Sequence, residues 1–370
     1  MPTSSVEKMT FLERFQRPKV LIPSLVGLAI CALLIGATIY WVGSKNSNVS
    51  PIQKLTSASS SSTQPNPPCP LTGTPSPNPQ VPARPALAVK IDNYPAARPQ
   101  TGLNQADVVF EEPVEGGITR LVAVYQCQQP PLVGPIRSAR EPDVAIVDLL
   151  SRPIFIHVGG IPPIESMMAS SNSIDEDLFY DGSLVIHPSG RQAPYDTYIS
   201  PTSAWAKYSS DGTAPSPLFQ YSPSQPPGPR ISSANVPFSP TNNNTWTWSQ
   251  STNDWDLSIG GSPATDISGN QLTAENVLIL TVETFQGPWV ENSLGAHEVE
   301  VNPTSGGPFQ LLRNGVDVSG TWSRSSLSSP LVLSDANGNP VSLAPGRTWI
   351  EMLPSPISPT TSPASSNPSS

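Results

Sequence analysis

A stretch of 23 residues without a charge, residues 20–42, constrains this chain more than any other feature. A helix of ~20 apolar residues is long enough to cross a bilayer core. Tyr40 and Trp41 lie at its far end, where aromatic side chains prefer the headgroup region. Three basic residues precede it: Arg14, Arg17 and Lys19. We therefore expect residues 1–19 inside the cell, a single membrane-spanning helix over 20–42, and the rest of the chain outside.

A cleaved signal peptide, or a lipoprotein signal in which Cys31 takes the lipid, is the alternative for this stretch. The apolar part of a cleaved signal is shorter, about 7–15 residues. Ile30 is also bulkier than the residue that a lipoprotein signal usually has before its cysteine. The sequence therefore favours an uncleaved anchor.

Proline-rich segments divide the remainder of the chain, which contains 46 prolines. Residues 43–68 consist mostly of Ser, Thr, Asn, Gln and Pro, which cannot bury enough surface to offset the entropy of ordering. We expect a disordered stalk there and a disordered tail of similar composition over 354–370. Residues 209–240, rich in Pro, Ser and Gly, are expected to connect two domains.

The two expected domains differ in their patterns. Residues 69–208 contain the apolar runs ALAVKID, ADVVFEE, ITRLVAVYQC and IFIHV, together with a helical pattern that begins at Pro142. Residues 241–353 contain short β-type runs with turn dipeptides such as Asn314-Gly315. The predicted fold is an α/β (or α+β) N-terminal domain plus a small all-β C-terminal domain, after one transmembrane helix.

The net charge of the chain limits the partners it can bind, and its cysteines indicate the cellular compartment in which it folds. The formal net charge of −9 and a pI near 4.8 argue against nucleic-acid binding, which requires a basic surface. Cys69 and Cys127 lie in the part expected outside, where disulfides form. They either pair with each other or remain two separately buried thiols.

The segment GPIRSAR, residues 134–140, is the clearest candidate site. Its Arg137 and Arg140 precede the expected Pro142 helix, and guanidinium groups bind phosphate or carboxylate oxygens well. Arg120 is expected to be a third donor. The alternative is that these arginines pair internally with nearby acids and only stabilise the fold. Those acids are Asp92, Glu111, Glu112 and Glu115.

Catalysis would need an acid or base beside these arginines. Asp92 and His157 each follow an apolar run, and Glu115 precedes the Gly116-Gly117 turn, so these three are the candidates. The sequence shows no metal-ligand spacing, no nucleotide-binding loop and no GxSxG motif, and we therefore expect neither a metal nor a cofactor. Whether the protein is an enzyme stays open.

Several motifs resemble, in order, those of the YerB-like bacterial lipoproteins, catalogued as domain of unknown function 3048. They are PLTG, AVKIDN, ARPQTGLNQADVVFE, EGGITRLVAVYQ, VGPIRSAR, APYDTYIS, TSGGPFQLLRNG, SGTWS and PGRTWIEMLP, and they span residues 70–354. The resemblance implies a two-domain surface protein held at a bacterial membrane and implies no activity. This chain departs from the family in having Tyr195-Asp196 where the family often has His-Asn.

The sequence thus predicts a membrane-anchored, extracytoplasmic envelope protein that binds an anionic cell-wall polymer or an envelope protein. The alternative is a hydrolase or transferase that acts on an anionic cell-wall polymer, with Asp92, Glu115 or His157 as acid or base and the arginines as the anion holders.

Overall fold

The computed structural model describes residues 65–208, 210–240 and 242–364. These described residues form one compact unit. Its three described α-helices are short, and each begins at a proline, whose fixed φ suits the first helical turn. They are α2 (Pro142–Asp148), α3 (Pro162–Ala169) and α4 (Pro201–Tyr208). Four 3-10 turns accompany them: η1 (Pro95–Ala97), η2 (Leu103–Gln105), η3 (Glu115–Gly117) and η4 (Gly182–Leu184).

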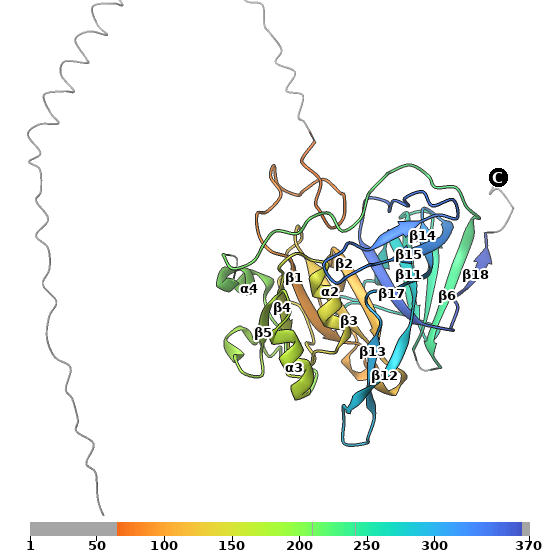
Figure 1. The fold of residues 1–370 in the computed structure, drawn as a ribbon. Helices are drawn as coiled ribbons and strands as arrows, with labels where there is room; N and C mark the ends of the chain where they lie inside the picture. The colour runs from red at the N-terminus through yellow and green to blue at the C-terminus, as the bar shows by residue number, and fades with distance from the viewer. Residues whose placement is uncertain (1–64, 209, 241, 365–370) are drawn as a thin grey trace, which may run out of the picture. The chain divides into compact units, whose positions relative to one another are not determined.

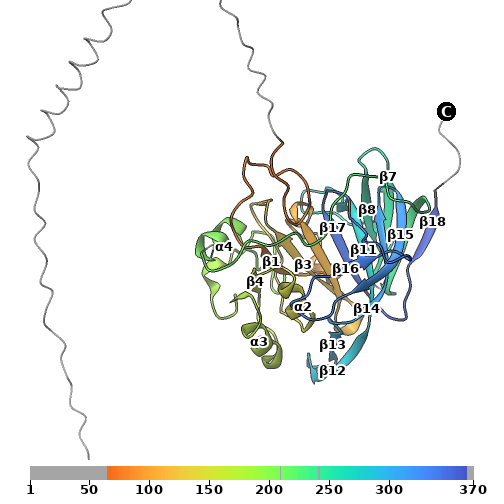
Figure 2. The same ribbon diagram turned by 45° about the horizontal axis from the view of Figure 1, so that its top comes forward.

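A ten-stranded sheet is the centre of the structure, in the order β16-β15-β14-β11-β17-β2-β3-β1-β4-β5 (Figure 1). Its strands from the first half of the chain are β1 (Leu87–Asp92), β2 (Val108–Pro113), β3 (Thr119–Tyr125), β4 (Ile154–His157) and β5 (Ile174–Asp177). Those from the second half are β11 (Asn276–Val282), β14 (Gly306–Arg313), β15 (Val316–Ser323), β16 (Val332–Ser334) and β17 (Thr348–Pro354). The two halves meet where β17 pairs with β2 in parallel, and Figure 2 shows β17 at this junction.

A smaller six-stranded sheet packs against one face of the large sheet. Its order is β10-β8-β7-β6-β18, with β9 paired to β8. The strands are β6 (Ile231–Ser239), β7 (Asn242–Ser249), β8 (Asp254–Ile259), β9 (Ser262–Pro263), β10 (Thr273–Ala274) and β18 (Thr360–Pro363). Strands β12 (Thr284–Val290) and β13 (His297–Val301) form a separate hairpin. Strand β18 belongs to the segment expected as a tail, and β6 begins within the expected connection.

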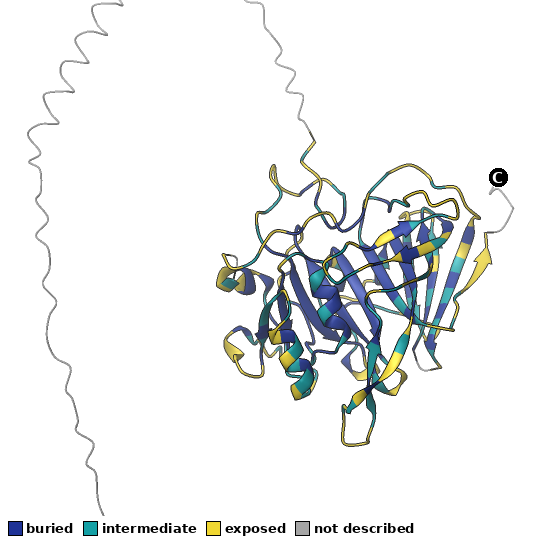
Figure 3. Cartoon of the chain, in the orientation of Figure 1, coloured by how far each residue is buried: buried dark blue, intermediate teal, exposed yellow. Residues whose placement is uncertain are grey.

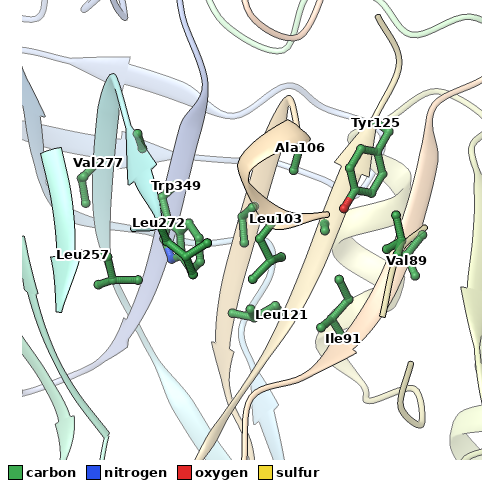
Figure 4. Packing of buried hydrophobic residues seen from close by; sticks show 14 of the residues in the cluster. Val89, Ile91, Leu103, Ala106, Leu121, Tyr125, Leu257, Leu272, Val277 and Trp349 are labelled. Carbon is green, nitrogen blue, oxygen red and sulfur yellow. The ribbon is translucent and has the colours of Figure 1, made fainter. Parts of the chain in front are cut away.

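Both faces of the large sheet are covered, which explains why its first strands read as continuous apolar runs. Every residue of β1, β2 and β3 is buried, as the dark central strands in Figure 3 show. One face packs on the smaller sheet, with Val89 and Leu121 in the same cluster as Leu257 and Trp349 (Figure 4). The other face packs on α2 and α3.

The fold class expected from the sequence is wrong. The described part consists mostly of β-strands, and one sheet runs through both expected domains, because β17 inserts between β2 and β11. Within the described ranges, no helix has the length and apolar character needed to cross a membrane. The segment 20–42, expected as the transmembrane helix, lies outside the described residues.

The hairpin expected over ADVVFEEPVEGGITRLVAVYQC is confirmed, since β2 and β3 pair antiparallel around η3. The helix expected after Pro142 is confirmed as α2. In the structure Cys69 and Cys127, both buried, form a disulfide with a Cα–Cα distance of 6.1 Å. It joins the segment before β1 to the end of β3.

We predict that removing this disulfide, by Cys69→Ser and Cys127→Ser together, lowers the free energy of unfolding. The bridge closes a loop of 58 residues. Constraint of the unfolded chain then contributes about 3–5 kcal/mol. Urea denaturation measures the loss, and peptide mapping without reductant should recover the joined peptides. Recovery of both cysteines as free thiols would contradict the pairing.

Candidate functional site

A pocket of about 400 Å³ opens where β1 ends and β3 begins. Its mostly polar and charged lining comes from six segments: the end of β1, the η3 turn, the start of β3, the GPIRSAR segment, the loop before α4 and the β12–β13 hairpin. The lining residues are Asp92, Tyr94, Glu115, Ile118, Arg120, Arg137, Ser138, Arg140, Tyr195, Glu291 and Asn292. The structure therefore brings together all three candidate arginines and two of the three candidate acid–base residues.

Arg120 forms the floor of the pocket because of strand register. It is the cross-strand partner of both Asp92 in β1 and Glu112 in β2, and directly opposed residues point to the same face of a sheet. Its Nη1 donates to the Ser138 carbonyl oxygen at 3.0 Å, while its buried Nε has no hydrogen-bond partner among the described residues. Burial and the positive charges of Arg140 and Arg137 lower the pKa of Arg120 to about 10, although Glu115 and Asp92 oppose this shift.

Arg140 is buried and forms ion pairs with acidic side chains of the same chain. Its guanidinium, 2% exposed, makes a two-pronged contact with Glu115, at 2.7 and 3.0 Å, and reaches Glu291 at 2.6 Å. Glu298 lies 3.9 Å from its Nε. Because Glu115 belongs to η3 and the other two acids to the β12–β13 hairpin, Arg140 fastens the hairpin to the rest of the fold.

Glu291 and Glu298 are two buried acids that share this single arginine. Burial and the hydrogen bond between them raise the pKa of Glu298 to about 8, although the charge of Arg140 opposes this shift. Glu298 is therefore protonated at neutral pH and can donate to Glu291. One oxygen of each residue, Oε2, accepts from no nitrogen or hydroxyl of the described part.

Arg137 differs from the other two arginines because its side chain is 36% exposed. Its Nε lies 3.1 Å from Asp92 Oδ2, and Asp92 Oδ1 accepts from the Tyr94 backbone N–H at 2.8 Å. Within the described ranges, nothing accepts a hydrogen bond from its terminal Nη1 and Nη2 groups. Tyr94 and Tyr195 stand beside it with stacked rings, 6.4 Å between centroids and 5° between planes.

The start of α2, which the sequence offered as an anion-binding terminus, is occupied by the protein itself. The Arg140 backbone N–H donates to Asp143 Oδ2 at 2.7 Å, and the Glu141 N–H donates to Glu298 Oε1 at 3.2 Å. These donors are therefore satisfied by carboxylates of this chain, and any anion in the pocket must rely on side chains.

His157 is not among the residues that line the pocket. Its Nε2 lies 2.9 Å from Asp175 Oδ1, and its Nδ1 lies 3.0 Å from the Gly159 carbonyl oxygen. Burial lowers the pKa of His157, but the hydrogen bond and charge of Asp175 outweigh it and raise the pKa. His157 therefore connects the end of β4 to Asp175 in β5 and does not join Asp92 and Glu115.

A buried ion cluster lies on the same face of the sheet and was missed by the sequence analysis. Lys90 Nζ contacts Glu112 and lies 2.7 Å from Asp143 Oδ1, and all three side chains are fully buried. Burial and the charge of Asp143 raise the pKa of Glu112 to about 7, against the effect of Lys90. The cluster ties β1 and β2 to the first turn of α2.

A second buried cluster, also missed, lies on the opposite face. Glu111 in β2 and Glu351 in β17 are fully buried cross-strand partners. Amide, hydroxyl and indole groups donate to them from both sheets. The donors are Asn93, Thr119, Asn242, Asn244, Trp246 and Trp349. Burial and the charge of Glu111 hold the pKa of Glu351 well above its ordinary value.

A sequence signal for both clusters exists: charged residues inside apolar runs. Lys90 interrupts ALAVKID, the pair Glu111-Glu112 ends ADVVFEE, and Glu351 lies within TWIEML. Because successive residues of a strand point to opposite faces, adjacent glutamates in a doubly covered strand must serve two different networks.

The chain belongs to a family whose two parts are described as the N-terminal and C-terminal domains of "Protein of unknown function (DUF3048)". The N-terminal model matches residues 71–214 and the C-terminal model matches residues 234–350. The resemblance inferred from the sequence motifs is thereby confirmed.

A relative from Bacillus subtilis (strain 168) carries the name "Putative lipoprotein YerB". It is 29% identical over 297 residues, which is 77% of this chain and 86% of the relative. The crystal structure of the YerB protein from Bacillus subtilis superposes with a TM-score of 0.68 at 26% identity. That match covers 80% of this chain and 99% of the other.

We predict that Arg140→Ala and Arg137→Ala affect stability very differently. Removing Arg140 leaves buried carboxylates without a counter-charge, which costs about 3–5 kcal/mol. Removing Arg137, whose side chain is 36% exposed, costs about 1 kcal/mol or less. Urea denaturation of the two variants measures both values, and equal losses would contradict the distinction between them.

We also predict that the free energy of unfolding falls as the pH rises from about 5 to about 8. The pKa values of Asp107, Glu112, Glu141 and Glu298 are raised to about 6, 7, 7 and 8, mainly by burial. The folded state then binds more protons than the unfolded state, so raising the pH favours unfolding.

Glu298→Gln should flatten the upper part of this profile, near pH 7–8, because the amide cannot ionise. The exposed Glu283→Gln is the matched control and should leave the profile unchanged. Urea denaturation at a series of pH values measures each curve. A wild-type stability that rises over this range would refute the assignment.

Proposed function

We propose that this protein is an envelope-associated binding protein whose pocket holds a carboxylate of a cell-wall component on Arg137, with Arg120 beneath it. One observation carries the proposal: the terminal guanidinium groups of Arg137 are accessible and have no partner in the described part of the chain. A planar guanidinium with two free N–H groups suits a carboxylate, which it can bind through two parallel hydrogen bonds.

The electrostatics of the pocket floor support the same ligand. The pKa of Arg120 is lowered by burial and by two neighbouring arginines, so a negative group beside it would relieve that repulsion. The three arginines face the carboxylates of Asp92, Glu115 and Glu291, and the pocket carries little net charge. A singly charged carboxylate therefore fits better than a doubly charged phosphate.

Envelope association is supported by the similarity to the Bacillus subtilis protein, whose name describes a lipoprotein. The disulfide between Cys69 and Cys127 also fits a compartment outside the reducing cytosol.

The alternative, an envelope hydrolase or transferase, has less support. Glu115 is bound by Arg140, which together with Arg120 outweighs its burial and lowers its pKa, so it is a poor proton donor. Asp92 is 4% exposed and is held by Arg137 and the Tyr94 N–H. His157 lies outside the pocket.

We predict that wild-type protein binds N-acetylmuramic acid, a sugar with a carboxylate, and that Arg137→Ala weakens this binding by about 1–3 kcal/mol, the contribution of a hydrogen bond to a charged group. Neutral N-acetylglucosamine should bind less well to the wild type and should not respond to the substitution.

Isothermal titration calorimetry measures both ligands. Arg137→Lys is the matched control: it keeps the charge but loses the planar fork, so it should recover only part of the affinity. Equal binding by wild type and Arg137→Ala would refute the proposal.

A further inference from the structure

We propose that the pocket is one end of a longer binding edge, and that its ligand is a glycan strand whose sugar rings stack on exposed aromatic side chains. This inference rests on the proposed function and adds the class of ligand. The edge consists of Tyr94 and Tyr195 beside the pocket and of Phe179 and Tyr180 further along; we call it the aromatic edge.

The topology places these residues on one edge of the sheet. Strands β1, β4 and β5 are parallel neighbours, so their carboxyl ends lie at the same side. Tyr94 follows β1 by two residues, Gly159 follows β4 by two, and Phe179 follows β5 by two. Residues far apart in the sequence therefore emerge in a row.

Arg137 lies within this row, between β1 and β4. Its backbone N–H donates to the Lys90 carbonyl oxygen at 3.0 Å, and its carbonyl oxygen accepts from the Val158 N–H at 3.1 Å. Phe179 lies against Gly159: its Cβ is 3.9 Å from the position that a Cβ on Gly159 would occupy. Counting the Arg137 segment, β5 is three strand positions from β1, which at ~4.8 Å per strand is about 14 Å. This distance suits a few consecutive sugar rings.

The aromatic residues are exposed to an extent that the fold does not explain. Phe179 and Tyr180 are 70% and 72% exposed, and Tyr94 is 46% exposed. These are three of the four strongly exposed aromatic side chains in the described part; the fourth is Phe285, on the hairpin. Large exposed apolar groups gathered at one place typically mark a binding surface.

The exposed rings are nevertheless held in position. Asp177 Oδ1 accepts from the backbone N–H groups of Phe179, at 2.9 Å, and Gly159, at 2.7 Å. Tyr180 donates to Glu165 Oε2 at 3.2 Å, and the rings of Phe179 and Tyr180 meet edge to face at 5.1 Å. Rings fixed in this way lose little entropy when a ligand stacks on them.

A glycan fits this edge better than a peptide. The rings form two separate pairs among polar groups, not one continuous apolar groove. A sugar ring offers an apolar face of C–H groups for stacking and hydroxyl groups for the polar surroundings. A carboxylate on the strand would then reach Arg137 while neighbouring rings extend to Phe179.

The test compares a peptide-free glycan strand of alternating N-acetylglucosamine and N-acetylmuramic acid with the N-acetylmuramic acid monosaccharide, using the full chain and titration calorimetry. We expect the strand to bind wild type at least tenfold more tightly than the monosaccharide. Phe179→Ala with Tyr180→Ala should remove this gain and leave monosaccharide binding unchanged. Phe285→Ala, which removes an exposed ring outside the aromatic edge, is the control and should change the binding of neither ligand.

The outcomes separate this inference from the proposed function. If binding of the glycan strand is unaffected by the Phe179 and Tyr180 substitutions but is lost in Arg137→Ala, the aromatic edge is overturned and the carboxylate pocket is kept. If binding of the glycan strand depends on Phe179 and Tyr180 but not on Arg137, the aromatic edge is kept and the carboxylate pocket is overturned. No binding of either sugar to wild type would overturn both.

Discussion

The burial of Glu111 and Glu351 at paired positions of adjacent strands is the constraint on which the rest of the structure depends. Two carboxyl groups buried in adjacent parallel strands can remain there only if hydrogen-bond donors surround their oxygens. The donors come from Asn93, the residue after β1, and from strands β3, β7 and β17. Both sheets and both halves of the chain must therefore be in place before this pair is satisfied.

The same sheet separates this structural cluster from the candidate site. Glu111 points to the smaller sheet. Its neighbour Glu112 points to α2 and contacts Lys90, which also contacts Asp143. Asp92 and Asn93 divide in the same way: Asp92 faces Arg137 in the pocket, while Asn93 donates to Glu111. The buried network and the pocket therefore use adjacent residues of the same strands, on opposite faces of the sheet.

Much of the local structure could be predicted from the sequence, and the long-range pairing could not. The runs around Leu87 and Val108 predicted strands, and Pro142 predicted a helix start, because these signals depend on neighbouring residues. The insertion of β17 between β2 and β11 joins residues more than 200 positions apart, and no local pattern encodes it. The sharing of one sheet by both family segments was therefore not predictable from the sequence.

The sequence predicted most of the residues that meet in the pocket, but it did not predict which of them are bound internally and which remain accessible. GPIRSAR and Arg120 do meet, yet only the structure shows that Arg140 is bound by Glu115 and by two hairpin acids while Arg137 stays accessible. Neither Glu291 nor Glu298 stood out in the sequence, because an acid in a polar hairpin is ordinarily solvated. His157 ends a strand as Asp92 does, but its hydrogen bond to Asp175 keeps it outside the pocket.

The two family segments share one sheet through β17, and the donors to Glu111 and Glu351 come from both of them. Differential scanning calorimetry of the chain should therefore show one transition whose calorimetric and van't Hoff enthalpies agree, because neither half can satisfy its buried acids alone. Two separate transitions, one for each family segment, would contradict it.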